Sequence, residues 1–191
     1  GCAPDKQADT IHLDRQLEYC DAQIRRTLSE ADQDSCLMPR SMEANQTNWN
    51  MSNIYDWTSG FWPGILWYDY EATGDEEIKA QAIRYTECLL PLVTPAHGAD
   101  HDIGFQIFCS FGNAYRITGN EEYKTVILKG AQKLAKLYNP KVGTILSWPG
   151  MVKRMGWPHN TIMDNMMNLE ILFWAARNGG GQELYDIAVK H

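Results

Sequence analysis

The sequence lacks several features that would assign it to a class at once. None of its apolar runs approaches the roughly 18 residues needed to span a membrane. Its five cysteines, at positions 2, 20, 36, 88 and 109, contain no CxxC pair or cysteine–histidine cluster, and their odd number gives no clean disulfide framework. Lysine and arginine number 17 against 24 aspartates and glutamates, so no basic stripe is present to bind nucleic acid.

Aromatic residues are what the sequence has in quantity. It contains seven Trp, nine Tyr and five Phe, many of them between Trp49 and Tyr70. Aromatic side chains that line a cleft suit sugar rings, although any single Trp is more often part of a core. With 44% hydrophobic and 21% charged residues, the composition is that of a globular protein.

The apolar periodicity is helical along most of the chain. Within residues 11–30, apolar residues recur at roughly helical intervals, which predicts an amphipathic helix; they are Ile11, Leu17, Ile24 and Leu28. Residues 31–60 are rich in Asp, Asn, Ser and Met, which predicts a long loop, and such loops are often functional. No alternating strand pattern competes with this interpretation.

Two segments, 66–89 and 113–137, repeat one pattern. Each has an aromatic helix end, a Thr-Gly pair, an Asp or Asn, two Glu and a second helix. The glycine is expected to end the first helix in the left-handed conformation, and the Asp or Asn to cap the next one. These positions are Gly74 with Asp75 and Gly119 with Asn120.

A looser third copy spans residues 172–191, with its break at residues 179–181. Repeated helical hairpins predict an all-α array, which can close into an (α/α)₆ toroid with inner helices around a cavity. We expect residues 11–191 to form roughly the N-terminal half of one such toroid, with residues 1–10 as a tether. The rest of the toroid is expected C-terminal to His191.

Two acidic residues stand immediately before apolar helical runs. In "HDIGF", His101 and Asp102 precede the run 105–111, and in "TIMDNMMNLEILFWA", Asp164 precedes the run 165–174. Each Asp could cap its helix, and this interpretation has about the same weight as a functional one. If both helices are inner helices with their N-terminal ends at one mouth, the two carboxylates face the same space.

Three segments in this order resemble the unsaturated glucuronyl hydrolases of glycoside hydrolase family 88. They are "DWTSGFWPGILWYDYEATGDE", "HDIGF" and "MDNMMNLEILFWAA", and the resemblance runs from about Asp56 to Ala176. The unsaturated rhamnogalacturonyl hydrolases share the toroid, but this sequence is less similar to them. The resemblance implies an enzyme that acts on the unsaturated uronic acid left at the non-reducing end when a lyase cuts a glycosaminoglycan or similar polymer.

The chemistry implied by the resemblance is hydration of the C4=C5 enol ether rather than direct displacement at the anomeric carbon. Asp164 would be the general acid/base, and Asp102 would assist it. Two carboxylates in one site would raise each other's pKa and keep one of them protonated near neutral pH. Trp57 and His101 would contact substrate, although packing and a local hydrogen bond are the ordinary roles of such residues. No metal or other cofactor is expected.

Other features leave alternatives open. Met163, Met166 and Met167 beside Asp164 could furnish adaptable apolar walls for the site, although filling the core is their more ordinary role. His159 and Asn160 either contact substrate or lie on a loop surface. A carbohydrate-binding helical module without catalysis, and a toroid glycosidase that works by ordinary inversion, are the competing functions.

Cys2, followed by the polar stretch "APDKQAD", stands where a processed bacterial lipoprotein would carry its lipid. This predicts a periplasmic or cell-envelope protein that touches a membrane only through that lipid. An arbitrary truncation that exposes a cysteine explains the same residues equally well.

Overall fold

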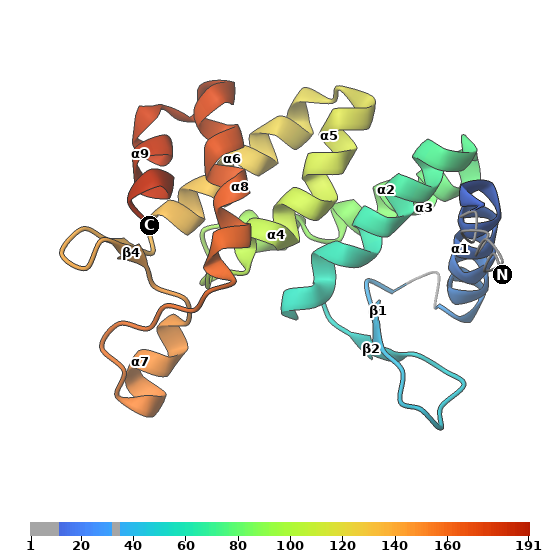
Figure 1. Ribbon diagram of the computed structural model, residues 1–191, viewed down its shortest axis with the longest axis horizontal. Helices are drawn as coiled ribbons and strands as arrows, with labels where there is room; N and C mark the ends of the chain where they lie inside the picture. Colours follow the sequence, from blue (N-terminus) through green and yellow to red (C-terminus); the bar gives the residue numbers. More distant parts are fainter. Residues whose placement is uncertain (1–11, 32–34) are drawn as a thin grey trace, which may run out of the picture.

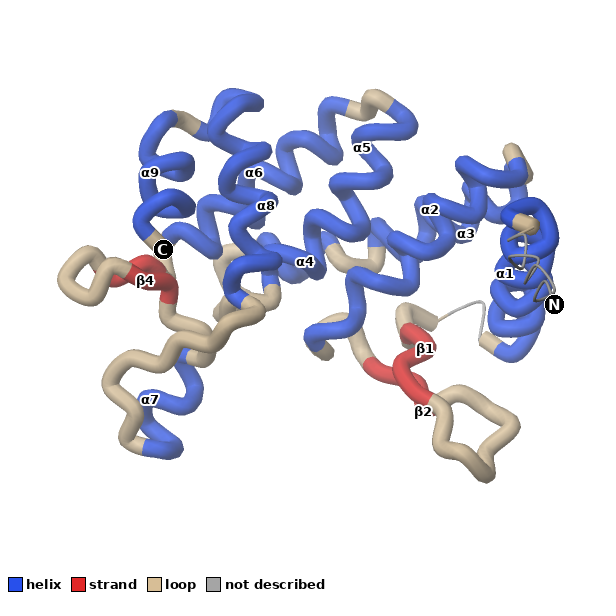
Figure 2. Tube along the Cα trace, in the orientation of Figure 1, coloured by secondary structure: helices blue, strands red, loops and turns tan. Residues whose placement is uncertain are grey.

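A computed structural model describes residues 12–31 and 35–191, and helices dominate it (Figures 1 and 2). The α-helices are α1 (Leu13–Glu30), α2 (Phe61–Thr73), α3 (Glu76–Glu87), α4 (Ile103–Ile107), α5 (Asn113–Thr118), α6 (Glu121–Ala135), α7 (Pro149–Met155), α8 (Asn165–Ala175) and α9 (Gln182–Lys190). Short 3₁₀ helices are η1 (Trp57–Gly60) and η2 (Leu90–Val93), and π-helical turns are η3 (Phe108–Gly112) and η4 (Ala176–Gly180). In these described ranges, no helix is both long and apolar enough to cross a membrane.

The helices pair into hairpins that lie side by side in an arc, as Figure 1 shows. α2 packs against α3, α4 packs against α6 and α8, and α8 packs against α9. α4, η3 and α5 follow one another without a break, so they form one long helix with a π-helical turn in its middle. The predicted all-α hairpin array is confirmed as part of an (α/α)₆ toroid.

The predicted turns of the first two hairpins are confirmed in detail. Gly74 and Gly119 have φ of 70° and 67°, the left-handed conformation that only glycine adopts without strain. Asp75 Oδ1 accepts a hydrogen bond from Glu77 N at 2.8 Å, and Asn120 Oδ1 accepts one from Glu122 N at 3.0 Å. Each side chain therefore satisfies an N–H group that the helix itself leaves unpaired.

The third hairpin turns differently. Gly179 and Gly181 have φ of 103° and 94°, so the break falls where the sequence predicts it. Gly181 precedes α9 and has no side chain to cap it, which explains why this copy of the repeat matches the other two only loosely.

The prediction of a long loop over residues 31–60 is wrong in part. Antiparallel strands β1 (Met38–Ser41) and β2 (Asn50–Ser52) pair there, and η1 follows. Asp56 caps η1 by accepting from Thr58 N at 3.0 Å, and Gln106 Nε2 donates to the Asp56 carbonyl at 2.9 Å. A second small sheet pairs β3 (Tyr138–Asn139) with β4 (Thr144–Ile145). Strands of two to four residues are too short to show an alternating pattern in sequence.

A disulfide joins Cys36 to Cys88, across 52 residues of sequence, although the cysteine count predicts no clean framework. Spacing alone cannot identify a pair that the fold brings together. The bond ties the segment before β1 to the end of α3, and a cross-link that closes such a loop typically stabilises a protein by about 2–4 kcal/mol. Cys20 and Cys109 are free thiols, while Cys2 and the proposed tether lie outside the described residues.

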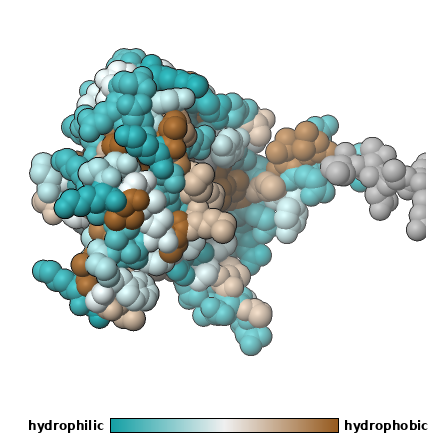
Figure 3. All heavy atoms as spheres, turned by 60° about the vertical axis from the view of Figure 1, so that its left-hand side comes forward, coloured by the Kyte–Doolittle hydropathy of each residue, from teal (hydrophilic) through white to brown (hydrophobic). Residues whose placement is uncertain are grey.

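Most of the core consists of side chains from α2, α3, α4, α6, α8 and α9 that pack against one another. Trp67, Tyr85 and Phe111 are its largest fully buried side chains, and the Trp67 indole N–H donates to Thr86 Oγ1 at 2.9 Å. Full burial of a large apolar side chain contributes about 1.5–3 kcal/mol. The face of the molecule in Figure 3 is mostly hydrophilic, with hydrophobic residues scattered over it.

Candidate active site

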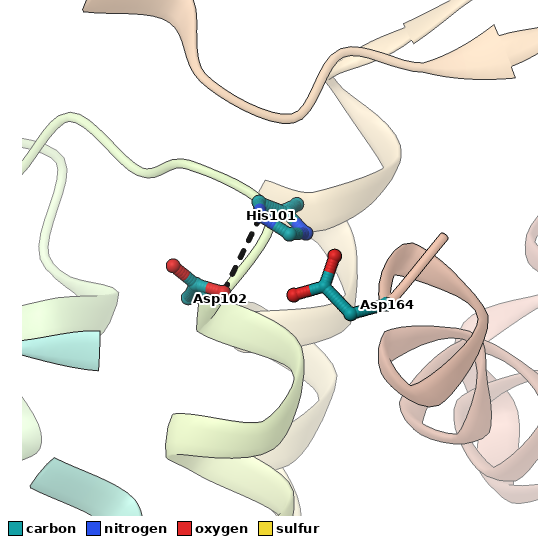
Figure 4. A group of neighbouring side chains, drawn as sticks. All are labelled: His101, Asp102 and Asp164. Carbon is teal, nitrogen blue, oxygen red and sulfur yellow. Dashed lines mark ion pairs between the residues drawn. The ribbon is translucent and has the colours of Figure 1, made fainter. Parts of the chain in front are cut away.

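The predicted site residues line one small pocket. Its walls are Trp57, His101, Asp102, Trp148 and Asp164, around a volume of about 150 Å³. In Figure 4, His101 and Asp102 come from the start of α4 and Asp164 from the start of α8, and their side chains converge. The structure thus brings together four residues that sequence reasoning selected and adds Trp148, which it missed.

Both acids occupy the position before a helix, yet neither caps it. Asp102 precedes α4 and Asp164 precedes α8, and in the described part of the chain neither carboxylate accepts a hydrogen bond from its own helix. The capping interpretation is therefore wrong for both residues. Asp164 Oδ1 is buried and has no hydrogen-bond partner among the described residues, so it is free to bind a proton or a ligand.

His101 is fully buried at 0% exposure beneath the two acids. Its Nδ1 lies 3.3 Å from Asn168 Nδ2. Its Nε2 lies 3.4 Å from Asp102 Oδ1, but no described acceptor meets it in hydrogen-bond geometry. The expectation that His101 makes a satisfied local hydrogen bond therefore holds for Nδ1 only, and Nε2 faces the acids.

Burial sets the proton affinities of this group. It raises the pKa of Asp102 to about 7, and the negative charges of Asp100, Asp164 and Asp56 add to the effect. Burial also lowers the pKa of His101, against opposing contributions from Asp164, Asp100 and Asn165, so the imidazole is neutral near pH 7. The site therefore holds a carboxyl group that exchanges its proton near neutral pH beside a neutral imidazole.

Ser147 joins the two helix starts. Its carbonyl accepts from His101 N at 3.0 Å, and its hydroxyl accepts from Ile162 N at 3.1 Å and from Asn165 Nδ2 at 2.8 Å. Ser147 is fully buried and lies in the segment between β4 and α7. No local signal in the sequence marks it, because its contacts come from segments far apart in the chain.

Trp148 covers the imidazole. The two ring centroids are 5.7 Å apart and the rings are nearly perpendicular, at 76°. Asn160 holds the Trp148 backbone from both sides, since its Oδ1 accepts from Trp148 N at 2.8 Å and its Nδ2 donates to the Trp148 carbonyl at 3.1 Å. His159 bonds Thr144 Oγ1 at 2.8 Å. Both residues thus shape the loop that carries Trp148.

Trp57 forms the opposite wall. One of its faces packs near Phe61 and Phe105, with ring centroids 6.0 Å and 6.2 Å away. The side chain is nevertheless 48% exposed, which leaves surface for a ligand. Substrate contact by Trp57 stays a prediction.

The three methionines around Asp164 do not fill the core. Met163, Met166 and Met167 are 89%, 59% and 64% exposed, so that expectation is wrong. Met163 precedes α8, and the helical period places Met166 and Met167 on a different face of α8 from the buried residues Asn165, Asn168 and Leu169.

The donor set also bears on metal binding. His101, Asp102 and Asp164 each offer one ligand atom, and these three atoms lie within 4.8 Å of one another. Such a group is compact enough to share a cation, and equally compact enough to share a proton. The raised pKa of Asp102 agrees with a shared proton. The expectation that no metal takes part stays a prediction.

Comparison with known sequences gives one consistent result. Residues 32–191 match Glycosyl Hydrolase Family 88. The chain is 39% identical over 154 residues to an unsaturated glucuronyl hydrolase of Formosa agariphila, covering 80% of this chain and 38% of that protein. It is 35% identical over 137 residues to an unsaturated chondroitin disaccharide hydrolase of Streptococcus pneumoniae, covering 71% of this chain and 34% of that protein.

Solved structures agree with the sequences. The crystal structure of an unsaturated glucuronyl hydrolase specific for heparin superposes with a TM-score of 0.83 at 37% identity, over 94% of this chain and 46% of that one. The unsaturated glucuronyl hydrolase of Bacillus sp. GL1 superposes with a TM-score of 0.80 at 26% identity, over 93% of this chain and 46% of that one. The chain thus spans less than half the length of the relatives it matches, and it belongs to Glycosyl Hydrolase Family 88.

Proposed function

We propose that the protein is an unsaturated glucuronyl hydrolase, and that this chain supplies its acid/base residues. The observation that carries the proposal is the convergence of Asp102 and Asp164 on one pocket, where burial raises the pKa of Asp102 to about 7. Enol-ether hydration needs one carboxyl group that gives and regains a proton close to neutral pH. The substrates would be lyase-generated glycosaminoglycan oligosaccharides, because the relatives are named for chondroitin and heparin.

In the proposed reaction, Asp164 gives its proton to C4 of the unsaturated uronic acid. Water adds at C5, and the proton that it loses returns to the carboxylate. The hemiketal at C5 then opens to a C5 ketone and a hemiacetal at C1, and collapse of this hemiacetal to an aldehyde breaks the bond to the remaining sugar and releases it. Asp102 in its protonated form and the neutral His101 would stabilise the negative charge on Asp164 between the two proton transfers.

The competing functions make different demands on the pocket. Ordinary inversion places two carboxyl groups roughly 6.5–9.5 Å apart to admit a water between them. One oxygen of Asp102 and one of Asp164 lie within 4.8 Å of each other, a spacing that favours a proton shared between them over a water held between them. A sugar-binding module would not need a buried acid pair at all, because burying unpaired acids destabilises a protein.

The test uses the full-length protein with unsaturated chondroitin and heparin disaccharides in D₂O. Hydration abolishes the ultraviolet absorbance of the C4=C5 bond and leaves deuterium on C4 of the product. Unsaturated rhamnogalacturonyl disaccharide serves as the comparison substrate for the related family. Binding in a calorimeter with unchanged absorbance would favour the binding module, and turnover of saturated glucuronides would favour an ordinary glycosidase.

For location, we propose a cell-envelope protein that is lipidated on Cys2, which the polar stretch after that residue supports. The precursor expressed in a bacterial host should partition with membranes, and Cys2→Ser should release it. Release of the unmutated precursor after signal cleavage would contradict this proposal.

A further inference from the structure

Asn168 is a buried polar residue in the apolar helix α8, and proton transfer by the two acids does not involve it directly. It is 1% exposed and lies one helical turn after Asp164. Its Oδ1 accepts from Phe105 N at 2.8 Å, and its Nδ2 lies 3.3 Å from His101 Nδ1. Both ends of the amide therefore reach across to the start of α4.

These two contacts fix the orientation of the amide. The backbone N–H of Phe105 can only donate, so the atom that faces it must be the amide oxygen. The amide nitrogen is then the atom that faces His101, and it also can only donate. Nδ1 must therefore be the unprotonated ring nitrogen, and in a neutral imidazole the proton resides on Nε2.

The surroundings of Nε2 agree with this assignment. Asp102 Oδ1 lies 3.4 Å away, and a ligand atom of Asp164 lies within 4.8 Å of the imidazole. Asp164 Oδ1 is buried and has no partner among the described residues. A proton on Nε2 faces oxygen atoms that can accept it.

Gly104 makes the contact possible. A Cβ at this position would lie 2.3 Å from Asn168 Oδ1 and 2.6 Å from Asn168 Cβ. Any side chain at residue 104 would push Asn168 away from the backbone of α4. The glycine of "HDIGF" and the last asparagine of "DNMMN" thus form one structural unit.

We propose that Asn168 is a positioning residue that holds His101 in the Nε2–H tautomer, so that a neutral donor faces the Asp102 and Asp164 carboxylates. This donor stabilises whichever carboxylate is negative after the proton has moved to the substrate. The tautomer follows from the hydrogen bonds alone, and its contribution to turnover rests on the proposed function.

The tautomer is measured by NMR on the full-length protein with ¹⁵N-labelled histidine. The His101 signal is identified by its loss in His101→Gln, and its two-bond couplings show which ring nitrogen carries the proton. We expect the Nε2–H pattern near pH 7. An Nδ1–H pattern in the parent protein overturns the proposal whatever the activity, and this result does not depend on whether Asn168→Asp folds.

The variant Asn168→Asp keeps the shape of the side chain and the bond to Phe105 N but presents an acceptor to His101 Nδ1. We expect the proton of His101 to move to Nδ1, or both nitrogens to become protonated. Loss of one preorganised donor lowers kcat by roughly 10²–10³-fold, with KM little changed. An unaltered NMR pattern or a parental kcat in the folded variant contradicts the proposal.

Two controls separate positioning from a general structural effect. Asn113→Asp also changes a buried asparagine, whose Nδ2 donates to Cys109 O at 2.8 Å, and it should leave kcat unchanged. In a His101→Gln background, Asn168→Asp should add little further loss, because it acts through His101. Additive losses would show that Asn168 acts independently of His101. If the parent has the Nε2–H pattern but never turns over unsaturated substrates, the proposed function fails and the tautomer assignment stands.

Discussion

Two pairs of helix starts in this chain look alike in sequence and differ in what their side chains do. Asp75 and Asn120 precede α3 and α6, and each accepts a hydrogen bond from a backbone N–H of the helix that follows. Asp102 and Asp164 precede α4 and α8, and their carboxylates turn to a shared pocket instead.

The backbone explains the difference. Asp75 and Asn120 have ψ of 116° and 112°, the extended conformation from which a capping side chain reaches the first turn. Asp102 and Asp164 have ψ of −15° and −11°, so they are already helical. The ψ angle of the residue before the helix thus determines whether its side chain caps the helix or lines the pocket.

The largest expected effect comes from the pocket. Asp164→Asn keeps the size of the side chain but removes the transferable proton, and it should lower kcat by roughly 10²–10⁴-fold. Because this side chain caps no helix, the free energy of unfolding should stay within about 0.5 kcal/mol of that of the parent. Turnover is followed by the loss of C4=C5 absorbance, and parental turnover would remove Asp164 from the chemistry.

The next effect tests the contact between the two helix starts. Gly104→Ala forces its new Cβ against Asn168, and such overpacking destabilises a protein by about 1–3 kcal/mol. Gly98→Ala is the matched control, because its Cβ would meet no described atom within 4 Å. Urea unfolding of the two variants gives the comparison. Equal stability would mean that α4 and α8 are not in close contact at this point.

Asp102→Asn should stabilise the protein above neutral pH. The folded pKa of Asp102, about 7, lies above the ordinary value of 3.8, so the folded state binds the extra proton and loses stability as pH rises through this range. The variant should match the parent near pH 4 and exceed it at pH 8 by about 1–2 kcal/mol, since water at the pocket mouth reduces the full effect. The measurement is the Tm of the variant and of the parent as a function of pH. A variant that is less stable than the parent at pH 8 would contradict the prediction.

The smallest effect belongs to the capping pair. Asp75→Ala and Asn120→Ala should each lose about 1 kcal/mol of stability, while kcat stays at the parental value. Asp75→Asn should retain most of the capping, because asparagine caps about as well as aspartate. Loss of activity in any of these variants would contradict the assignment of a purely structural role to Asp75 and Asn120.

Local chemistry explains why much of the fold could be predicted from the sequence. The Thr-Gly-Asp and Thr-Gly-Asn turns depend on a left-handed glycine and a capping side chain next to each other. The two acids of the pocket were predictable for a related reason, because each stands directly before an apolar helix. Their convergence followed from the hairpin repeat together with the family resemblance.

The parts that could not be predicted depend on contacts between distant segments. Cys36 meets Cys88 only in the folded chain. Trp148 reaches the pocket, and Ser147 reaches Asn165 at the start of α8, from a loop without a distinctive pattern. Asn168 did leave a signal, since a polar residue on the apolar face of a helix requires a buried partner. The exposure of the three methionines was not visible, because α8 is apolar on all sides.

The most direct test of a proton shared between Asp102 and Asp164 is the pH dependence of kcat/KM in the full-length protein and in Asp102→Asn. A shared proton predicts that parental activity falls as pH rises through about 7, the pKa of Asp102, because the proton needed at C4 is then lost. In Asp102→Asn, the fall near pH 7 should disappear from the profile of the slowed enzyme. An unchanged fall at the same pH in the variant would show that the two carboxylates do not act as one unit.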